Sequence, residues 1–351
     1  MNSRSVFDLW RDPYVIAEIG VNHNGDLDLT RRSIDRAVDA GVDAVKFQTF
    51  RAEEFMADPD HIYEYESGGA KVRESMFEMF KRLELPERWY DPLRDYARER
   101  GVDFLSSSAD PESVDLLVDL GVPALKVASE DLINLPLLAH VANAGLPVLL
   151  STGMGDEVEV DRALSVLRPK VPAILLLHCV SLYPTPDAEV NLRRMTALAD
   201  RTGLPVGYSD HSRGIEAAVG AVALGARVIE KHFTLDRALP GPDHSLSADP
   251  DEMTALVRAC RRVASMRGEE RVSPSPGEHQ ARLDFRRSIV AARDLEAGTV
   301  LSTSDLALKR PGTGLHPFRM EELLGRRLLT VVARNERLTL DHLAPEPGRT
   351  P

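Results

Sequence analysis

The feature that most constrains this chain is an alternation, along its first 265 or so residues, between short apolar runs and longer amphipathic segments. The short runs have the length and composition of buried strands. They are Tyr14–Ile19, Asp43–Thr49, Val102–Ser107, Ala124–Ser129, Pro147–Thr152, Ala173–Cys179, Pro205–Ser209 and Arg227–His232. Helical spacing marks segments between them, including Leu27–Ala40, Pro111–Leu120, Leu135–Ala144, Ile215–Leu224 and Pro250–Met266. Eight strand–helix units in a row predict an α/β fold, the (β/α)₈ TIM barrel.

Glycine placement supports this prediction. Several helical segments end in glycine just before a strand, in AGVDAVKF, RGVDFLSS, LGVPALKV, AGLPVLLS and LGARVIEK. Glycine at the end of a helix, followed by a buried strand, is typical of this connection. A doubly wound open sheet is the alternative fold. A glycine fingerprint after the first strand would favour it, and VNHNGD does not contain one.

The alternation stops near Arg267. RGEERVSPSPGEHQ is polar, holds two prolines and two glycines, and is typical of a linker. Beyond it, short β-like runs are separated by turn residues. The sequence therefore predicts a barrel domain over residues 1–266, a linker over 267–282, a small β-rich domain over 283–346 and a disordered tail over 347–351.

Composition narrows the classes of function. With 55 acidic and 43 basic side chains, the net charge is −12, which argues against non-specific binding to nucleic acid or anionic membranes. The N-terminus lacks the apolar core of a signal peptide, and no apolar run approaches the ~18 residues of a membrane helix. Two cysteines are too few for a disulfide framework. We expect a cytoplasmic protein.

Polar residues recur at the carboxyl ends of the predicted strands, where the active sites of such barrels lie. They include Glu18, Lys46, Gln48, Ser107, Lys126, Ser129, Glu130, Asp131, Ser151, Tyr183, Ser209, His211, Glu230 and His232. A barrel interior is normally filled by Val, Ile and Leu, and burying so many unpaired polar groups would cost a few kcal/mol each. One such residue alone is more often a satisfied core or loop group, but the set as a whole indicates a functional site.

Two pairs within this set suggest chemistry. Lys46 and Lys126 come from strands close enough for both cations to converge on one anion, and serine hydroxyls surround them. That arrangement suits a phosphate and a carboxylate together, which phosphoenolpyruvate carries. His211 and His232 stand on adjacent strand ends. As neutral imidazoles they could bind a divalent metal and leave positions open for substrate, although a structural role for either histidine alone is equally consistent.

The segments AEIGVNHNGDLDLT, VKFQTF, LKVASEDLINLPLL, LLSTGMG, HCVSLYPTP, GYSDHS, IEKHFTLDRALPGPDHSLSADPDEM and LKRPGTGL occur in this order. Together they resemble the sialic acid (N-acetylneuraminate) synthase family. The resemblance covers nearly the whole chain, and its C-terminal part is similar to that family's antifreeze-like (SAF) domain. It implies condensation of phosphoenolpyruvate with an N-acetylated aldose such as N-acetylmannosamine, using Mn²⁺ or Mg²⁺, in a domain-swapped homodimer.

The resemblance also implies a role for each matching residue. Phosphoenolpyruvate would contact Lys46, Ser107, Lys126, Ser129, Ser151 and Ser209. The metal would be held by His211 and His232, and Glu18, Gln48, Asp131 and Glu230 would serve catalysis. The sugar would contact Tyr183, Asp243 and, from the partner's small domain, Arg310. Taken without the resemblance, Arg310 is typical of a solvated loop arginine.

Three departures from the family pattern concern the acceptor sugar. Glu130 and Asp131 are adjacent, where the family's acid often follows a glycine; we take Asp131 as the equivalent, with Glu130 as the alternative. Ser181 replaces an asparagine found in some members. The predicted loop Asp58–Glu74 does not match the family's sugar-contacting loop. A doubly N-acetylated sugar of the legionaminic or pseudaminic type, or another aldose, is therefore an alternative acceptor.

Other functions on the same barrel are conceivable. A Schiff-base aldolase would use Lys126 or Lys46, and pyruvate with borohydride would trap it. A metal-dependent hydrolase often carries an H-x-H pair on its first strand, which EIGVNHNG lacks. A non-enzymatic binding protein would not need polar residues at every strand end.

Overall fold

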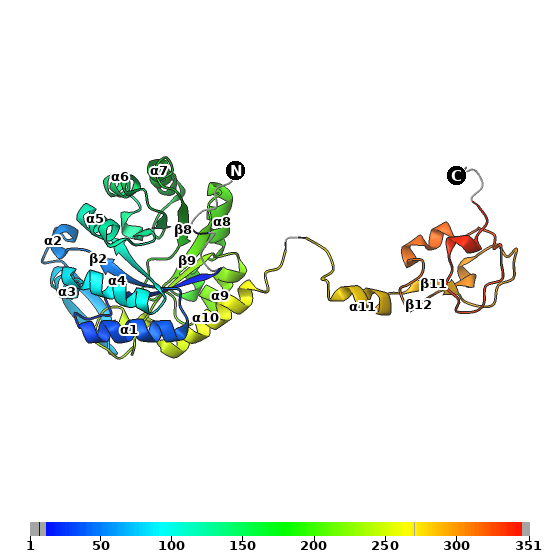
Figure 1. The fold of residues 1–351 in the computed structure, drawn as a ribbon, viewed down its shortest axis with the longest axis horizontal. Helices are drawn as coiled ribbons and strands as arrows, with labels where there is room; N and C mark the ends of the chain where they lie inside the picture. The colour runs from blue at the N-terminus through cyan, green and yellow to red at the C-terminus, as the bar shows by residue number, and fades with distance from the viewer. Residues whose placement is uncertain (1–6, 8–11, 270, 346–351) are drawn as a thin grey trace. The chain divides into compact units, whose positions relative to one another are not determined.

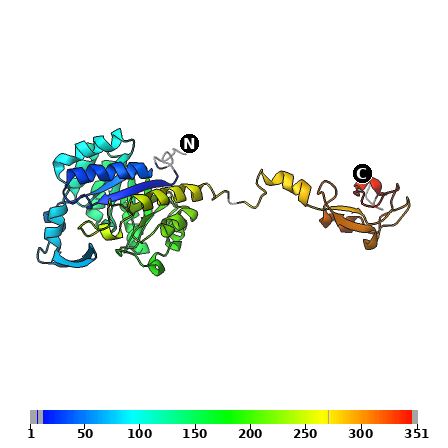
Figure 2. The ribbon, with the colours of Figure 1, turned by 90° about the horizontal axis from the view of Figure 1, so that it is seen from below.

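The computed structural model describes residue 7, residues 12–269 and residues 271–345 of the 351-residue chain. The chain divides into two compact units, Met1–Gly268 and Glu269–Pro351 (Figures 1 and 2). The predicted tail, 347–351, lies outside the described residues. Within the described part of the chain, no helix has both the length and the apolar character to cross a membrane.

The first unit is a closed barrel of eight parallel strands, as predicted, and closure excludes an open sheet. Its strands follow one another around the barrel as β1-β2-β5-β6-β7-β8-β9-β10, and β10 pairs with β1. Their bounds are β1 Tyr14–Gly20, β2 Ala44–Thr49, β5 Asp103–Ser108, β6 Leu125–Val127, β7 Val148–Ser151, β8 Ile174–His178, β9 Val206–Asp210 and β10 Val228–His232.

Helices surround the strands (Figure 1). They are α1 Leu27–Ala40, α2 Ala52–Phe55, α3 Met76–Leu83, α4 Tyr90–Glu99, α5 Pro111–Leu120, α6 Leu135–Ala144, α7 Glu157–Leu167, α8 Arg193–Thr202, α9 Glu216–Ala223 and α10 Pro250–Ala264. Aspartate caps begin several of them: Asp26, Asp110, Asp156 and Asp249 each accept a hydrogen bond from a backbone N–H of the first turn. Their apolar faces pack on the outer surface of the barrel in one large core.

The inside of the barrel changes character along its length. Side chains two apart on a strand share a face, so Ile16 and Glu18 both point inward, as do Leu149 and Ser151. Towards the amino ends, the inward residues are apolar and form one buried cluster, with Leu105 among them. Towards the carboxyl ends the inward residues are polar. The site therefore lies directly above a buried layer of apolar side chains that fills the barrel.

The segment between β2 and β5, which we call the excursion, is not the loop that was predicted at Asp58–Glu74. It contains an antiparallel hairpin of β3 Ile62–Ser67 and β4 Ala70–Ser75. Gly68 and Gly69 join the two strands with φ angles of 57° and 78°, the left-handed geometry that a two-residue hairpin turn requires. The alternation in IYEYES and the Gly-Gly pair carry this signal in the sequence.

The second unit has a small core of its own, which includes Ile289, Leu306 and Leu338. Strands β11 Ser288–Ala291 and β12 Leu306–Lys309 pair in antiparallel fashion, and short 3₁₀ turns complete the unit. Part of the predicted linker is helical, because α11 spans Glu278–Phe285. The Glu278 carboxylate accepts a hydrogen bond from the Ser275 backbone N–H at 2.7 Å, which helps to start this helix directly after the prolines.

Candidate active site

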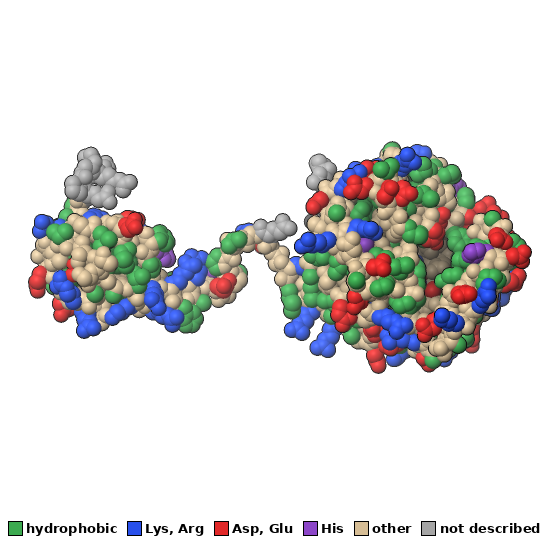
Figure 3. Space-filling model, turned by 180° about the vertical axis from the view of Figure 1, so that it is seen from behind, with side chains coloured by type: hydrophobic (Ala, Val, Ile, Leu, Met, Phe, Trp, Pro, Cys, Tyr) green, Lys and Arg blue, Asp and Glu red, His purple; other side chains and the backbone are tan. Residues whose placement is uncertain are grey.

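A cavity of about 200 Å³ opens at the carboxyl ends of the barrel strands, and Figure 3 shows a hollow in the large unit with acidic side chains beside it. It is large enough for a small organic anion rather than a few waters. All the predicted site residues of the barrel line it: Glu18, Lys46, Gln48, Ser107, Lys126, Ser129, Asp131, Ser151, Tyr183, Ser209, His211, Glu230, His232 and Asp243. Residues from seven strand ends and two loops thus meet, as the barrel topology predicts.

Four charged residues and one serine form the base of this cavity, which we call the charged floor: Glu18, Lys46, Lys126, Glu230 and Ser209. The Lys46 ammonium lies 2.8 Å from Glu18 and 3.7 Å from Glu230, and Lys126 lies 4.0 Å from Glu230. Both lysines are only 3% exposed. The Ser209 hydroxyl donates to Glu230 at 2.8 Å. Two buried cations therefore face one cavity, held by two carboxylates.

The two carboxylates of the charged floor differ in protonation. Burial raises the pKa of Glu18 to about 7, and the nearby Glu230 charge adds to the effect while Lys46 opposes it. Burial would also raise the pKa of Glu230, but Lys126, Lys46 and the Ser209 hydroxyl outweigh it and lower that pKa to about 2. At neutral pH, Glu18 can exchange a proton and Glu230 remains ionised, which separates an acid–base role from an electrostatic one.

Close backbone packing holds Ser129 and an unpredicted residue, Cys179, in the cavity wall. The Ser129 hydroxyl accepts a hydrogen bond from the Gly153 N–H at 3.1 Å and lies 3.0 Å from the Cys179 sulfur. A Cβ added to Gly153 would come within 2.8 Å of both side chains and within 2.6 Å of Ser181. The glycine of LLSTGMG is therefore required by space. Cys179 directly follows β8, and this position at a strand end could have identified it in the sequence as a site residue.

The histidine pair fits a metal site in its donor chemistry. The ring centroids of His211 and His232 are 5.5 Å apart. His211 Nδ1 lies 2.8 Å from the Val180 carbonyl, which can only accept, so Nδ1 carries the proton and Nε2 presents its lone pair towards the cavity. Burial lowers the pKa of His211, and it lowers that of His232 well below its usual range, so both rings are neutral.

His232 has an orphaned nitrogen as well. Its Nδ1 is buried without a hydrogen-bond partner and lies 3.8 Å from an Asp243 carboxylate oxygen. Two neutral imidazoles, each with an unprotonated nitrogen, and a carboxylate beside them suit a borderline divalent cation, although the His211 Nε2 lies 3.4 Å from the Ser209 hydroxyl. No cluster of three or more metal-binding side chains occurs among the described residues, so substrate or water would have to supply the remaining ligands.

The predicted sugar-binding residues lie at one side of the histidines. Tyr183 stacks on His211, with ring centroids 4.3 Å apart. Burial raises the pKa of Asp243 to about 6. Glu130 and Asp131 both line the cavity. Either carboxylate could therefore be the functional acid that follows β6. Asp131 is buried, and burial raises its pKa while the hydrogen bond from Asn134 opposes the shift.

An apolar wall, absent from the sequence predictions, also lines the cavity. It comes from the excursion after β2, whose hairpin contacts the loop that carries Asp243, and consists of Phe50, Phe55, Met76, Met79 and Phe80. The three phenylalanine rings contact one another, with centroids 5.1 to 5.9 Å apart. Tyr63 of the hairpin stands beside this wall. The helical spacing of Met76, Met79 and Phe80 is typical of any core-facing helix, so the sequence did not distinguish a cavity wall from core.

Arg310, the last predicted site residue, belongs to the second unit. Its guanidinium lies over the Phe285 ring, 5.4 Å from the centroid. Both side chains are exposed, Phe285 at 63%. The stacked pair presents a cation and an apolar face to an incoming group. Phe285 was not predicted.

Comparison with known proteins agrees with this geometry. The model of the NeuB family matches residues 33–272, and that of the SAF domain matches residues 286–344. The chain is 42% identical to an N,N'-diacetyllegionaminic acid synthase of Legionella pneumophila over 94% of each chain. It is 33% identical to the human N-acetylneuraminate-9-phosphate synthase over 96% of this chain and 94% of that one.

A solved structure is similar as well. The crystal structure of N-acetylneuraminic acid (sialic acid) synthetase from Leptospira borgpetersenii, in complex with citrate, has a TM-score of 0.71 at 35% identity. The match covers 77% of this chain and 90% of that one.

Proposed function

Because this chain belongs to the NeuB family, we propose that it condenses phosphoenolpyruvate with an N-acetylated aldose to give a nonulosonic acid and phosphate. The relatives named above are synthases of such acids. One observation carries the proposal: two buried lysines face a small cavity that is also lined, among other groups, by the carboxylates of Glu18 and Glu230, by the hydroxyls of Ser107, Ser129, Ser151 and Ser209, and by two neutral histidines. This is a site for a small dianion next to a polar electrophile.

The lysines would act as binding groups and not as nucleophiles. Burial alone would lower the pKa of Lys46, but Glu18 and Glu230 outweigh it and raise that pKa. A Schiff base requires an uncharged amine, so this environment disfavours the aldolase alternative at Lys46. Lys46 and Lys126 instead suit the carboxylate and phosphate of phosphoenolpyruvate, with Ser107, Ser129 and Ser151 donating to its remaining oxygens. Ser209 would also donate to the substrate once its hydroxyl turns away from Glu230.

The positions and charges of Glu18 and Glu230 assign each of them a step in the proposed reaction. The C2–C3 π electrons of phosphoenolpyruvate form the new bond to the aldehyde carbon, and the aldehyde oxygen takes up a proton. Glu18, whose pKa of about 7 leaves it partly protonated, would supply that proton. Positive charge develops at C2, where ionised Glu230 stabilises it. Water adds to C2 and gives a proton to the Glu18 carboxylate, which restores the acid. The C2–O bond to phosphate then breaks with its electrons going to the phosphate, and the C2 hydroxyl passes its proton to the phosphate to leave the C2 ketone.

We further propose that His211 and His232 hold a divalent metal, Mn²⁺ or Mg²⁺. When bound, it would polarise the aldehyde of the open-chain sugar as a Lewis acid. The supporting observations are the unprotonated Nε2 of His211, which lies 3.4 Å from the Ser209 hydroxyl, the buried Nδ1 of His232 that has no hydrogen-bond partner, and the neutral state of both rings.

For the acceptor, the apolar wall favours a doubly N-acetylated aldose over N-acetylmannosamine. Acetyl methyl groups gain from contact with Phe50, Phe55 and Phe80, whereas a second free hydroxyl would be left without a partner there. We expect phosphate release in an acceptor panel to be fastest with a diacetamido aldose. Preference for N-acetylmannosamine would contradict this assignment, and no release with any aldose would contradict the synthase proposal itself.

We also propose a domain-swapped homodimer in which Arg310, supported by Phe285, reaches the acceptor in the partner's barrel. Arg310→Ala and His211→Ala variants should each be nearly inactive. After unfolding and co-refolding, mixed dimers carry one intact composite site, so part of the activity should return. Mixed dimers that form and stay inactive, or a fully active monomer in sedimentation, would contradict this arrangement. The cytoplasmic location stays a prediction.

A further inference from the structure

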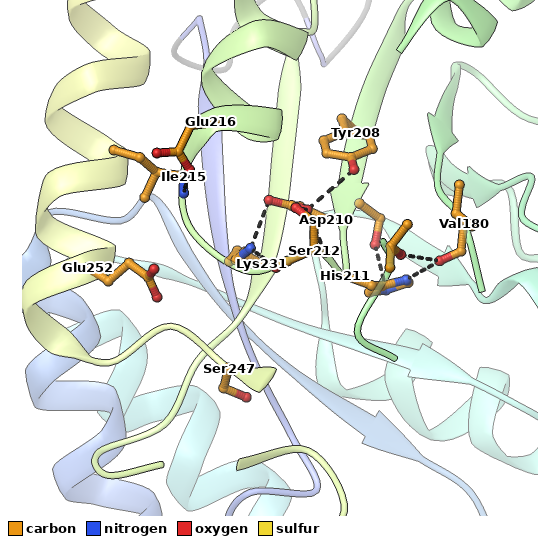
Figure 4. Close-up of polar contacts among 12 residues, drawn as sticks. Val180, Tyr208, Asp210, His211, Ser212, Ile215, Glu216, Lys231, Ser247 and Glu252 are labelled. Atoms are coloured by element: carbon orange, nitrogen blue, oxygen red, sulfur yellow. Dashed lines mark hydrogen bonds and ion pairs between the residues drawn. The ribbon is translucent and has the colours of Figure 1, made fainter. Parts of the chain in front are cut away.

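A buried ion pair lies directly behind the two histidines and has no part in the proposed reaction. The Lys231 ammonium donates to Asp210 at 2.9 Å and to the Ser212 carbonyl at 2.5 Å (Figure 4). Asp210 and Lys231 are each 1% exposed. Their inward neighbours on β9 and β10 line the cavity, so this pair points the other way, into the layer between barrel and helices.

Its place in the sheet relates it to the histidines. Asp210 and Lys231 are register partners on adjacent strands. Each stands one residue before a histidine: Asp210 ends β9 and His211 follows it, and Lys231 precedes His232, the last residue of β10. The ion pair therefore joins the two strand ends at the last paired position before the histidines.

Asp210 also shapes the turn that follows His211. Its Oδ1 accepts hydrogen bonds from the Ser212 N–H at 2.9 Å and the Ser212 hydroxyl at 2.6 Å, and from the Tyr208 hydroxyl at 3.3 Å. The His211 carbonyl accepts from the Thr185 N–H at 2.9 Å, and its Nδ1 donates to the Val180 carbonyl. His211 is thus fixed from both neighbours and through its ring, while Lys231 connects this framework to His232.

Stability alone does not account for such a pair. Desolvation of two fully buried charges offsets most of their attraction, and well-packed apolar side chains of similar volume are commonly as stable. The layer between barrel strands and helices is apolar in most of this protein. Hydrogen bonds of the ion pair fix the direction in which the two neighbouring strand ends are joined, and an apolar pair could not do this.

We propose that Asp210 and Lys231 are positioning residues, which set the separation and orientation of His211 and His232 and so determine the affinity of the site for a divalent cation. This inference rests on the metal site of the proposed function. The two residues touch neither substrate nor metal; they act through the histidines that follow them. Groups that orient metal ligands in this way commonly change affinity about 10–100-fold when they are removed.

The decisive variant is the double substitution Asp210→Asn with Lys231→Met. Single variants leave one uncompensated buried charge and can fail to fold, whereas the double variant removes both charges and retains an acceptor for Ser212. We expect its thermal unfolding to stay close to that of the wild type while the Kd for Mn²⁺, measured by titration calorimetry without substrate, rises about 10–100-fold. A double variant that binds Mn²⁺ as tightly as the wild type would overturn the proposal.

A matched control is Arg261→Met. Arg261 pairs with Asp43 at 3.1 Å at the opposite end of the barrel, so its loss removes an ion pair without touching the histidines. We expect lower stability and an unchanged Kd for Mn²⁺. An equal loss of Mn²⁺ affinity in this control would mean that general destabilisation explains the effect, and the positioning role would be wrong.

A metal-free measurement separates this inference from the proposed metal site. Nitrogen-15 spectra of the histidine rings should show His211 as one tautomer, protonated at Nδ1, in the wild type, and as exchanging tautomers in the double variant. If the wild type does not bind Mn²⁺, the metal proposal fails and the tautomer result alone decides the positioning role. An unchanged tautomer in the double variant would overturn it.

Discussion

The charged floor and the apolar wall enclose one cavity but are built in different ways. The floor consists of strand-end residues that are almost fully buried and are fixed by barrel register, by ion pairs and by the hydrogen bond from Ser209 to Glu230. The wall comes from one excursion between β2 and β5, whose hairpin strands are largely half-exposed. A substrate common to a family can be bound by the first, while the second can change without disturbing the barrel. In the proposed function, the floor would bind phosphoenolpyruvate and the wall would select the acceptor.

The largest effect should come from Glu18 in the charged floor. Glu18→Gln removes the proposed proton donor, so kcat should fall about 10²–10⁴-fold. In the wild type, kcat/KM should decrease as pH rises through about 7, because the pKa of Glu18 lies there and the acid form is the active one. The variant should lose that alkaline limb. Both are measured by phosphate release across pH.

Glu230→Gln provides the contrast. Its pKa of about 2 means that it is ionised throughout this range, so the variant should lose rate but keep an alkaline limb. That limb should move to lower pH, because the Glu230 charge raises the pKa of Glu18 in the wild type. A decrease of kcat/KM at alkaline pH that persists in Glu18→Gln, or that disappears in Glu230→Gln, would show that the roles of the two carboxylates are reversed.

Lys126→Met should give the next largest effect. Loss of one charge-assisted contact is worth about 1.5–3 kcal/mol, so the Kd for phosphoenolpyruvate should rise about 10–100-fold in calorimetry. Lys170→Met, on the surface, is the matched loss of a lysine and should leave binding unchanged. Unaltered phosphoenolpyruvate affinity in Lys126→Met would remove this lysine from the binding site.

The same comparison explains how much the sequence could reveal. Strands and their polar ends were predictable because a glycine-to-strand pattern recurs and because barrel topology brings every carboxyl end to one rim. Lys46, Lys126 and Glu230 therefore met as expected. The ion pairs among them and the opposite pKa shifts of Glu18 and Glu230 were not predictable, since they depend on distances of a few ångströms.

The wall was missed for a different reason. Phe55 and Phe80 are ordinary apolar residues whose positions depend on how the excursion folds back onto the rim, and periodicity does not report that. The hairpin itself had a signal in its Gly-Gly turn. The helix α11 was obscured by the polar, proline-containing stretch around it.

A smaller effect is expected at the apolar wall. Phe55→Ala should raise the acceptor KM about fivefold, since it removes part of an aromatic contact worth about 1 kcal/mol, and leave the KM for phosphoenolpyruvate unchanged. Preference for a diacetamido aldose over N-acetylmannosamine should decrease. Ile62→Ala is the control, because Ile62 is on the hairpin but 45% exposed and outside the cavity. A selective change in phosphoenolpyruvate KM would contradict the division between floor and wall.

The smallest effect concerns how the wall is attached to the rest of the site. At the hairpin turn, the Ser67 hydroxyl accepts a hydrogen bond from the Gly241 N–H at 3.0 Å, in the loop that carries Asp243. This contact holds the hairpin against the sugar-binding side of the cavity. A single neutral hydrogen bond contributes about 0.5–1.5 kcal/mol, and partial loss of hairpin docking should raise the acceptor KM of Ser67→Ala about two- to threefold. Ser245→Ala removes a longer contact, 3.4 Å from the Glu66 carbonyl, and should change KM less. The KM for phosphoenolpyruvate should not change in either variant, because the charged floor is fixed by the barrel strands. Equal acceptor KM values for the wild type and Ser67→Ala would show that the hairpin holds its position without this bond.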